Sequence, residues 1–520
     1  MDLSRPLALA LAGLALLAGC TGPEAADAPH SEAEGPAYAS SAPLLLEANW
    51  QDPTALEVEA PESRVIVHLF EWRWADVAEE CEVFLGPMGY DAVQLSPAAE
   101  NAVVEGRPWW ERYQPASYLI DNRSGDREDF ADMVRRCHDA GVEIYPDVIV
   151  NHMTGVYSGV GTAGSTFGEY DYPGLYAYDD FHHCGLTEGD EMVDGSDPVQ
   201  ATTCELVNLA DLATEQEDVR DRIAAHLNDL LSLGVDGFRL DAIRHVSEED
   251  TEAILSRLDR EVFIFSEVVD PAAPSWSEPY YPFGVVTNFT YSGRIGPTFW
   301  EGDLTDLYGE GSIWEDPGML PSEESLVFVD NHDNQRGRHG EHIVTHKDGD
   351  LYDLTVAFML AFPYGTTRVM SSFAFEDPEG GPPTVPGTEE ILPVHGEDGL
   401  RCNDGTWVCE HRRASIAPMV RFRSVTAGAP VDDWWTGAPA QIAFSRGDRG
   451  FFALNRDGSA PLEASLRTGL PAGTYCNVLD GVLRDGGCTG TAVTVGPDGV
   501  AEVAVPAMRA LALHVDARVE

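Results

Sequence analysis

The sequence predicts an α/β protein: a (β/α)8 barrel with an irregular insertion after its third strand, followed by a C-terminal antiparallel β-sandwich domain. From about residue 64 to 375, short apolar runs alternate with amphipathic segments, and eight such units indicate a barrel. A Gly-, Tyr- and Asp-rich stretch at 153–205 interrupts this alternation after the third run. Beyond about residue 430 only short alternating strands with turn signals remain, which favours a sandwich.

The predicted barrel strands are short apolar runs. In chain order they are VIVHLF (65–70), DAVQL (91–95), EIYPDVIV (143–150), VDGFRLD (235–241), VFIFSE (262–267), VVTNFT (285–290), LVFVDNHD (326–333) and TTRVM (366–370). Residues 215–233 repeat apolar positions every three or four residues before Gly234, which predicts a helix, and Ser247 with Asp250 predicts the cap of the next one. We therefore expect the barrel at 61–152 and 206–425, the insertion at 153–205 and the β domain at 426–520.

An apolar run at 6–19 follows Arg5 and ends in Leu17-Ala18-Gly19-Cys20. It is too short to span a bilayer and is typical of the leader of an exported protein. The tetrapeptide resembles the bacterial lipobox, so residues 1–20 are predicted to be a lipoprotein signal peptide with Cys20 lipidated; an ordinary signal peptide is the alternative. Residues 21–60 are expected to be a flexible tether. The mature chain would then be extracellular or at the cell surface, held to a membrane only by lipid.

The charge of the chain is extreme, with 88 Asp+Glu against 32 Lys+Arg among 520 residues and a net charge of −56. Such a chain repels phosphate backbones, and no basic run compensates, so a nucleic-acid partner is not expected. A hydrophobic content of 43% argues against disorder. The excess of acid favours adaptation to high salt, where charges are screened over a few ångströms. A merely acidic exported protein is the alternative.

The nine cysteines are an odd number for an exported protein. Assigning Cys20 to lipid leaves eight, which can form disulfides in an oxidising compartment. The closely spaced pairs are Cys402/Cys409 and Cys476/Cys488, Cys184/Cys204 would close a loop of modest size, and Cys81/Cys137 would join two helices.

Ionisable residues stand at the ends of several predicted strands, where a barrel places its active site. They are Asp147 with Asn151 and His152, Arg239 and Asp241 with His245 beyond, Glu267, and His332 with Asp333. Paired carboxylates are what cleavage of a glycosidic bond requires. Arg239 is expected to hold Asp241 ionised as a nucleophile, and the apolar strand before Glu267 favours a protonated acid there. The aromatic residues of PWWERYQP (108–115) are typical of a loop platform for sugar rings.

The segments DVIVNH (147–152), GFRLDAIRH (237–245), FSEVV (265–269) and FVDNHD (328–333) resemble the conserved regions of the α-amylase family of glycoside hydrolases. HLFEWRWADVAEECEVFLGP (68–87), RPWWERYQPASY (107–118), TRVMSS (367–372), WVCEHR (407–412) and residues 432–455 look like its animal-type, chloride-dependent members. The resemblance implies that Asp241 is the nucleophile, Glu267 the acid/base and Asp333 the transition-state stabiliser. It implies that substrate contacts Trp109, Trp110, Tyr113, Gln114, Asp147, His152, Arg239, Arg244, His245 and His332, with Arg244 standing where animal enzymes have a lysine.

The resemblance also implies two ions. A structural calcium would be held by Asn151 and Asp211 and by the backbone carbonyls of His245 and of Thr202, where the family has an arginine. An activating chloride would be held by Arg239, Asn331 and Arg368. Two departures stand out: the family's glycine-rich loop is here NQRGRHGEHIVTH (334–346), and a fifth family disulfide has no counterpart near Ile120.

The sequence therefore predicts a bacterial, lipid-anchored, monomeric α-amylase that cleaves internal α-1,4 bonds of starch, glycogen or maltooligosaccharides with retention. The altered 334–346 segment keeps open an exo-acting or transglycosylating relative that forms maltooligosaccharides. A non-catalytic glycan-binding lipoprotein is the third hypothesis, although such a module has no need of Asp241, Glu267 and Asp333 together.

Overall fold

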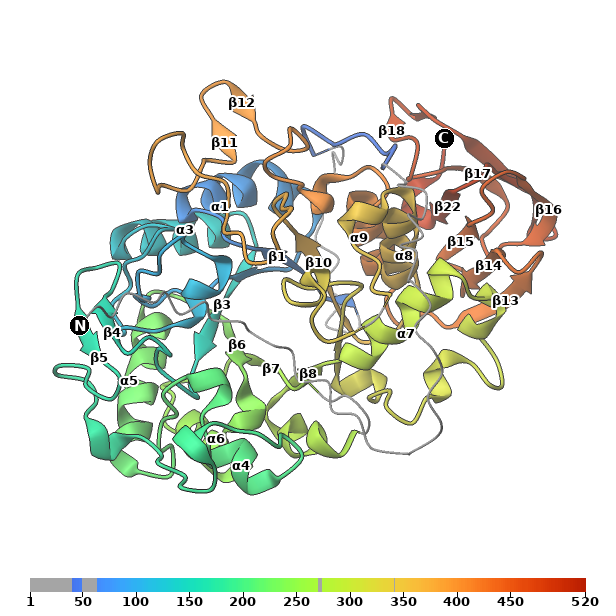
Figure 1. Ribbon diagram of the computed structural model, residues 1–520. Helices are drawn as coiled ribbons and strands as arrows, with labels where there is room; N and C mark the ends of the chain where they lie inside the picture. The colour runs from blue at the N-terminus through green and yellow to red at the C-terminus, as the bar shows by residue number, and fades with distance from the viewer. Residues whose placement is uncertain (1–39, 49–62, 270–273, 341) are drawn as a thin grey trace, which may run out of the picture. The chain divides into compact units, whose positions relative to one another are not determined.

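The structure is a computed structural model that describes residues 40–48, 63–269, 274–340 and 342–520. Among these residues, eight parallel strands close into a barrel in the order β1-β10-β9-β8-β7-β6-β3-β2 (Figure 1). They are β1 (Val65–Leu69), β2 (Ala92–Leu95), β3 (Glu143–Ile149), β6 (Gly237–Asp241), β7 (Phe263–Ser266), β8 (Val285–Thr287), β9 (Ser325–Val327) and β10 (Thr366–Ser371). Each coincides with or overlaps one of the predicted runs, so the predicted barrel is confirmed.

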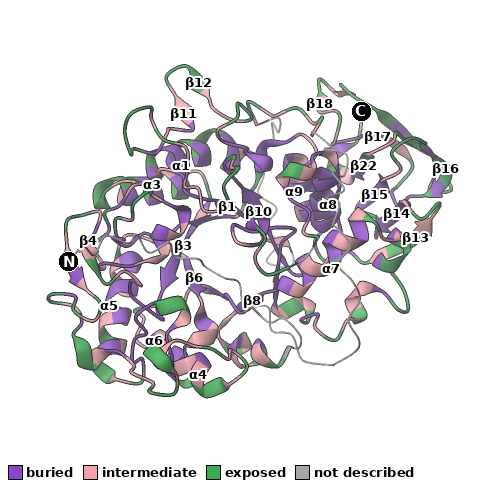
Figure 2. Cartoon of the chain, in the orientation of Figure 1, coloured by how far each residue is buried: buried purple, intermediate pink, exposed green. Residues whose placement is uncertain are grey.

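Helices follow most of the barrel strands. They are α1 (Trp74–Glu80), α2 (Gly86–Met88), α3 (Arg127–Asp139), α5 (Glu217–Ser232), α6 (Glu248–Leu255), α7 (Phe289–Trp300), α8 (Asp350–Ala361) and α9 (Ala417–Val425). The helix predicted at 215–233 is α5, and the Ser247 hydroxyl accepts the Asp250 N–H at 3.1 Å, which confirms the predicted cap of α6. Residues Leu351–Ala361 of α8 are all buried, as Figure 2 shows, because α7, α9 and the C-terminal strands pack around this helix.

The insertion after β3 contains little regular structure. It has the short strands β4 (Ser158–Val160) and β5 (Thr166–Gly168) and the short helix α4 (Pro198–Thr203). A bridge between His152 and Asp211 returns the insertion to the end of β3. The predicted irregular insertion is therefore confirmed.

The C-terminal domain is built from antiparallel strands. β13 (Val431–Thr436), β14 (Gln441–Arg446), β15 (Gly450–Asn455) and β22 (Arg509–His514) form one sheet in that order. Strand pairs complete the domain: β16 (Leu462–Arg467) with β21 (Val500–Val505), β17 (Gly473–Cys476) with β20 (Ala492–Val495), and β18 (Leu483–Arg484) with β19 (Gly487–Cys488). The domain is fixed to the barrel by guanidinium groups that donate to helix-end carbonyls: Arg446 bonds the carbonyl of Ala361 at 2.7 Å and Arg456 that of Phe299 at 2.6 Å.

Residues 40–48 differ from the flexible tether predicted at 21–60. The N–H of Leu45 donates to the carbonyl of Arg412 at 2.8 Å, and the Ser41 hydroxyl bonds Asp350 at 2.9 Å. These contacts hold the segment against the barrel, and the sequence missed them because their partners lie hundreds of residues away. The predicted leader at 1–20, with Cys20, and the rest of the tether apart from these residues lie outside the described residues.

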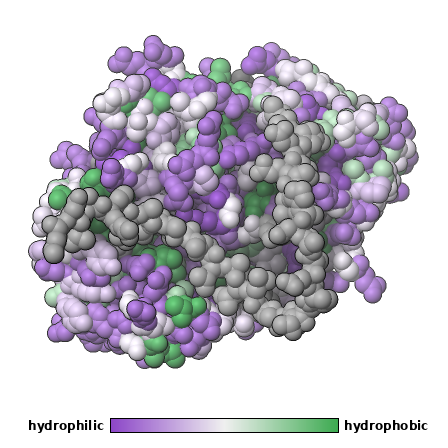
Figure 3. Space-filling view, viewed as in Figure 1, coloured by the Kyte–Doolittle hydropathy of each residue, from purple (hydrophilic) through white to green (hydrophobic). Residues whose placement is uncertain are grey.

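Disulfides join all eight cysteines of the described ranges in the predicted pairs, Cys81–Cys137, Cys184–Cys204, Cys402–Cys409 and Cys476–Cys488. The face seen in Figure 3 is mainly hydrophilic outside the grey atoms, in keeping with the excess of acidic residues. Within the described residues, none of the helices combines the length and the apolar character that crossing a membrane requires.

Candidate active site

Four carboxylates converge at one end of the barrel. Asp147 on β3 lies in register with Arg239 on β6, and Asp241 is the last residue of β6. Glu267 directly follows β7, and Asp333 belongs to the segment after β9. Because parallel strands all end at the same mouth of a barrel, residues far apart in sequence meet there.

Arg239 is the centre of this group. Its side chain is buried, its Nη1 donates to Asp241 at 2.8 Å and to Asp147, and its Nη2 lies 2.5 Å from Glu267. The second oxygen of Glu267 accepts the N–H of Ala242 at 2.9 Å, and Ala242 has a φ of 46°. A non-glycine residue in this left-handed region is strained, so the surrounding contacts must hold the turn in place. One guanidinium thus fixes the three carboxylates of Asp147, Asp241 and Glu267.

The charges are distributed differently from the sequence prediction, which paired Arg239 with Asp241 alone. Burial raises the pKa of Asp241 well above its usual value, although Arg239 opposes this, and burial also raises the pKa of Asp333. In Glu267 burial is outweighed by Arg239 and by the Ala242 N–H, so its pKa is lowered. The sequence could not foresee this, because the bond from Arg239 to Glu267 depends on the close approach of β6 and β7.

Neutral imidazoles line the mouth beside Asp333. Burial and the charges of neighbouring arginines lower the pKa of His68 and of His332 well below the usual value, so both rings are uncharged near neutrality. His332 Nε2 lies 3.3 Å from the carboxylate of Asp333, and the ring stacks on Tyr113 at 5.3 Å between centroids. The Tyr113 hydroxyl donates to Asp147 at 3.0 Å. Stacked rings beside the carboxylates are the kind of surface on which a sugar ring can pack.

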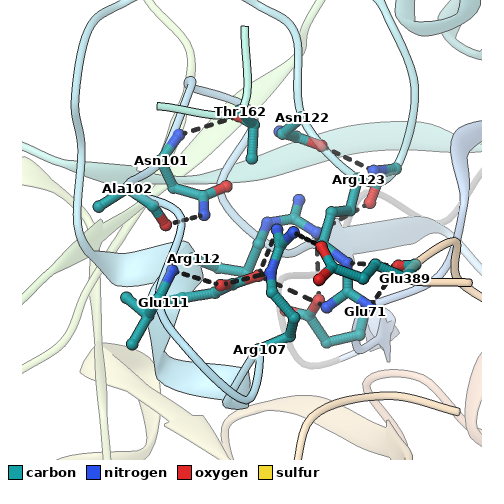
Figure 4. Close-up of polar contacts among 12 residues, drawn as sticks. Glu71, Asn101, Ala102, Arg107, Glu111, Arg112, Asn122, Arg123, Thr162 and Glu389 are labelled. Carbon is teal, nitrogen blue, oxygen red and sulfur yellow. Dashed lines mark hydrogen bonds and ion pairs between the residues drawn. The ribbon is translucent and has the colours of Figure 1, made fainter. Parts of the chain in front are cut away.

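The predicted platform forms a 3-10 helix, Trp109–Tyr113, rather than an irregular loop. A buried ionic network beneath it, drawn in Figure 4, fixes its position. Glu111 has no exposed side-chain surface and pairs with Arg107 at 2.9 Å and Arg123 at 3.4 Å. Arg107 also pairs with Glu389 at 2.7 Å, so the platform is joined to a segment almost three hundred residues away.

The platform residues differ in exposure. Trp110 is partly exposed and its Nε1 donates to Glu379 at 2.6 Å, whereas Trp109 is only 3% exposed and its Nε1 donates to the carbonyl of Pro378 at 3.0 Å. The side-chain oxygen of Gln114 accepts the Gly155 N–H at 2.7 Å and the Thr154 hydroxyl at 2.9 Å. Gln114 therefore joins the platform to the start of the insertion.

Two buried arginines near the carboxylates present unused donors. Nε of Arg239 and Nη2 of Arg368 are buried without a hydrogen-bond partner among the described residues. Arg368 Nη1 donates to Gln94 at 2.8 Å, and burial together with the charge of Arg239 lowers the pKa of Arg368 to about 10. Asn331, the third predicted ligand, is also buried, and its side-chain oxygen accepts the Asn334 N–H at 2.8 Å. Unpaired cationic N–H groups at the same barrel interior fit a small anion.

The predicted calcium ligands lie where the insertion meets the barrel. Asn151 and Asp211 are both buried, their side chains lie within hydrogen-bonding reach, and burial raises the pKa of Asp211 to about 6. His245 Nδ1 contacts the carbonyl of Ala201, next to Thr202, at 2.8 Å. The described residues contain no cluster of three or more acidic, His or Cys side chains able to hold a metal. One buried carboxylate with amide and carbonyl oxygens is nevertheless a donor set that suits a hard cation.

The remaining predicted residues flank the carboxylates. His152 Nε2 lies 3.2 Å from the carbonyl of Tyr113, and burial lowers the pKa of His152 to about 4. Arg244 stacks over Trp276 at 3.4 Å and bonds the carbonyl of Gly195 in the insertion.

Sequence reasoning missed several residues that shape the site. His182 Nδ1 bonds Asp211 at 2.6 Å, Gln94 positions Arg368, and Glu379 bonds Trp110. These contacts join segments that are distant in sequence. For His182, the only sequence signal was the presence of a histidine in the irregular insertion, which does not indicate that its side chain bonds Asp211.

Comparisons with known proteins find relatives along most of the chain. The family model described as "Alpha amylase, C-terminal all-beta domain" matches residues 434–516. An α-amylase-related protein of Drosophila auraria is 45% identical over 476 residues, which cover 87% of this chain and 94% of the relative. An α-amylase of Tenebrio molitor is 44% identical over 474 residues, covering 87% of this chain and 97% of the relative.

A solved structure is also similar along most of the chain. It is the complex of α-amylase I from Eisenia fetida, a glutamate-to-glutamine mutant, with maltohexaose. It is 36% identical, has a TM-score of 0.80, and covers 91% of this chain and 99% of its own.

Proposed function

The chain belongs to the α-amylase family of glycoside hydrolases, and we propose that it cleaves internal α-1,4-glucosidic bonds of starch, glycogen and maltooligosaccharides with retention of configuration. The observation that carries this proposal is the attachment of Asp241 and Glu267 to one guanidinium, at 2.8 and 2.5 Å. Carboxylates held by a single group are close together, which favours the separation of about 5 Å typical of retaining enzymes over the wider gap of inverting enzymes.

In the proposed mechanism Asp241 attacks the anomeric carbon in its ionised form, which the bond from Arg239 favours against burial, while Glu267 donates a proton to the leaving oxygen. The resulting glucosyl ester on Asp241 is then hydrolysed by a water molecule that Glu267 deprotonates. Asp333, beside the neutral His332, stabilises the positive charge that develops on the sugar. Arg239 orients both reacting carboxylates and prevents either from rotating away.

Glu267 must be protonated to act as the acid, but Arg239 lowers the pKa of Glu267. A further group that raises this pKa is therefore needed. We place a chloride ion at the unpartnered N–H groups of Arg239 and Arg368, with Asn331 beside them. When bound there, chloride supplies a negative charge that offsets Arg239 and raises the pKa of Glu267 toward that of a proton donor. Adding chloride should therefore shift the alkaline limb of the pH–kcat/KM profile to higher pH.

A calcium ion is proposed at Asn151 and Asp211, with the carbonyls of Thr202 and His245. Bound there, calcium would neutralise the buried Asp211 carboxylate and join the insertion to the end of β3. His182, which already bonds Asp211, would then act as an outer partner that orients this ligand.

Starch digestion distinguishes the candidate activities. Loss of iodine colour and release of reducing ends are followed together for the wild type and for Glu267→Gln. Fast colour loss per reducing end supports internal cleavage, slow loss indicates an exo-acting or transferring enzyme, and starch binding without reducing ends indicates a glycan-binding protein. Glu267→Gln should lower kcat by several orders of magnitude while it still binds starch; substantial turnover by this variant contradicts the assigned role.

We further propose that the protein is an exported, monomeric lipoprotein. Support comes from the apolar leader, from Cys20 and from cysteines that are otherwise all paired within the described residues. Expression in a bacterium with radiolabelled fatty acid should label the wild type and leave Cys20→Ala unlabelled and released from the membrane fraction. Equal labelling of the two proteins contradicts the lipid anchor.

A further inference from the structure

Trp109 is covered although it belongs to the platform. Its side chain is 3% exposed, and the guanidinium of Arg338 lies over its ring at 5.0 Å. Tyr113 and His332 meet the ring edge-on, at 6.0 and 5.5 Å between centroids. A sugar ring that stacked on Trp109 would have to take the place of one of these neighbours.

Arg338 is the neighbour that can leave. Arg336, which also contacts Trp109, is buried, donates to the carbonyl of His332 at 2.6 Å and lies among the rings of Phe70, Phe373 and Phe375. The Arg338 side chain, by contrast, is 38% exposed. Exposed guanidinium groups exchange readily with solvent, because water can replace their partners.

Glu379 holds Arg338 over the ring. One of its carboxylate oxygens lies 3.1 Å from Arg338 Nη2, and the other accepts Trp110 Nε1 at 2.6 Å. The neighbouring carbonyl of Pro378 accepts Trp109 Nε1 at 3.0 Å. The residues Pro378 and Glu379 thus position both indoles of the platform and the cation that covers one of them.

We propose that Arg338 is a specificity-determining residue, whose guanidinium occupies the face of Trp109 on which a glucose unit of an α-glucan chain stacks. The inference rests on the proposed function of the same site. An aromatic face binds either a cation or a sugar ring, so the two compete for it. Glucans long enough to reach Trp109 must displace Arg338 from it, whereas shorter ones leave the Arg338–Glu379 pair in place. Arg338 therefore weakens the binding of long substrates.

The test measures binding without turnover. The dissociation constant of maltohexaose is determined by calorimetry for full-length Glu267→Gln and for the same protein with Arg338→Ala added. We expect Arg338→Ala to lower the dissociation constant of maltohexaose about fivefold, because the substrate no longer has to break one exposed cation–π contact. Glu379→Gln, which keeps an acceptor for Trp110 but loses the ion pair, should tighten binding in the same direction by a smaller factor. Arg135→Ala, which removes another exposed, ion-paired arginine on α3, is the matched control and should change nothing.

A second comparison separates stacking from a general loosening of the site. The gain from Arg338→Ala should disappear when Trp109→Ala is also present, and in the active enzyme it should lower the KM for maltohexaose with little change in kcat. Unchanged or weaker maltohexaose binding by Arg338→Ala, or a gain that survives Trp109→Ala, overturns the inference and leaves the proposed function intact. If Glu267→Gln binds no maltohexaose and the wild type releases no reducing ends, both are overturned.

Discussion

Replacing Arg368 tests the proposed anion site most directly. Arg368→Gln removes a buried cation whose Nη2 lacks a partner among the described residues, and it keeps a polar, hydrogen-bonding side chain on the strand next to that of Gln94. A hydrogen bond to a charged group contributes about 1.5–3 kcal/mol. Losing this donor should therefore weaken chloride binding by about tenfold to about a hundredfold.

The fold should tolerate this change. Burial and the charge of Arg239 lower the pKa of Arg368 to about 10, so its surroundings disfavour the cation although it stays charged near neutrality. Removing the cation relieves that repulsion and offsets the lost stacking on Phe328, where the guanidinium lies 4.7 Å from the ring. We expect the melting temperature to change little.

The assay is amylolytic activity against chloride concentration, with ionic strength held constant by sodium gluconate. The wild type should saturate with chloride, and the half-saturating concentration should rise in Arg368→Gln but not in the exposed control Arg135→Gln. An unchanged half-saturating chloride concentration in Arg368→Gln would refute the proposed chloride site. Wild-type activity that does not depend on chloride concentration would refute it as well.

Three further predictions concern stability. Chelation by EDTA should lower the melting temperature of the wild type but not that of Asp211→Asn, because bound calcium stabilises only the folded state; an equal shift in both proteins places the ion elsewhere. Glu80→Gln should lower the free energy of unfolding by about 3–5 kcal/mol at neutral pH, because it leaves the buried guanidinium of Arg412 without its carboxylate partner. Burial of Glu80 is outweighed by bonds from His395, His411 and Arg412, so its pKa lies well below the usual value. Its stabilisation is thus present above the pKa of the unfolded chain and is lost on acidification, and urea unfolding should show the gap between wild type and variant closing below about pH 4. Finally, raising NaCl from about 0.1 to about 1 M should preserve or raise the melting temperature, in Arg368→Gln as well, because salt screens the net charge of −56; loss of structure in this range contradicts salt adaptation.

The barrel and the meeting of its carboxylates could be predicted because both depend on local patterns. Apolar runs mark the eight barrel strands, and a parallel barrel brings their ends together whatever the chain between them does. The spacing of Arg239 and Asp241, two residues apart on one strand, already placed them on the same side. Neither inference needed knowledge of a long-range contact.

The electrostatics of the site could not be predicted in the same way. The bond from Arg239 to Glu267 depends on how closely β6 and β7 approach, and it reverses the expected order of the two carboxyl pKa values. The covering of Trp109 depends on Arg338 and Pro378, both more than two hundred residues away. A sequence shows which residues are aromatic or charged, but not which residues from distant segments pack against them in the fold.

The bonds that Arg446 and Arg456 make to helix-end carbonyls of the barrel have a consequence for cooperativity. Their partners are neutral backbone groups, which neither titrate nor lose much attraction when mobile ions surround the protein. The junction also has two partly exposed ion pairs, Arg421–Asp516 and Arg509–Asp350, which should weaken as the salt concentration rises. Because the bonds to carbonyls persist, the β domain should still unfold together with the barrel in a single transition, from dilute buffer to brine.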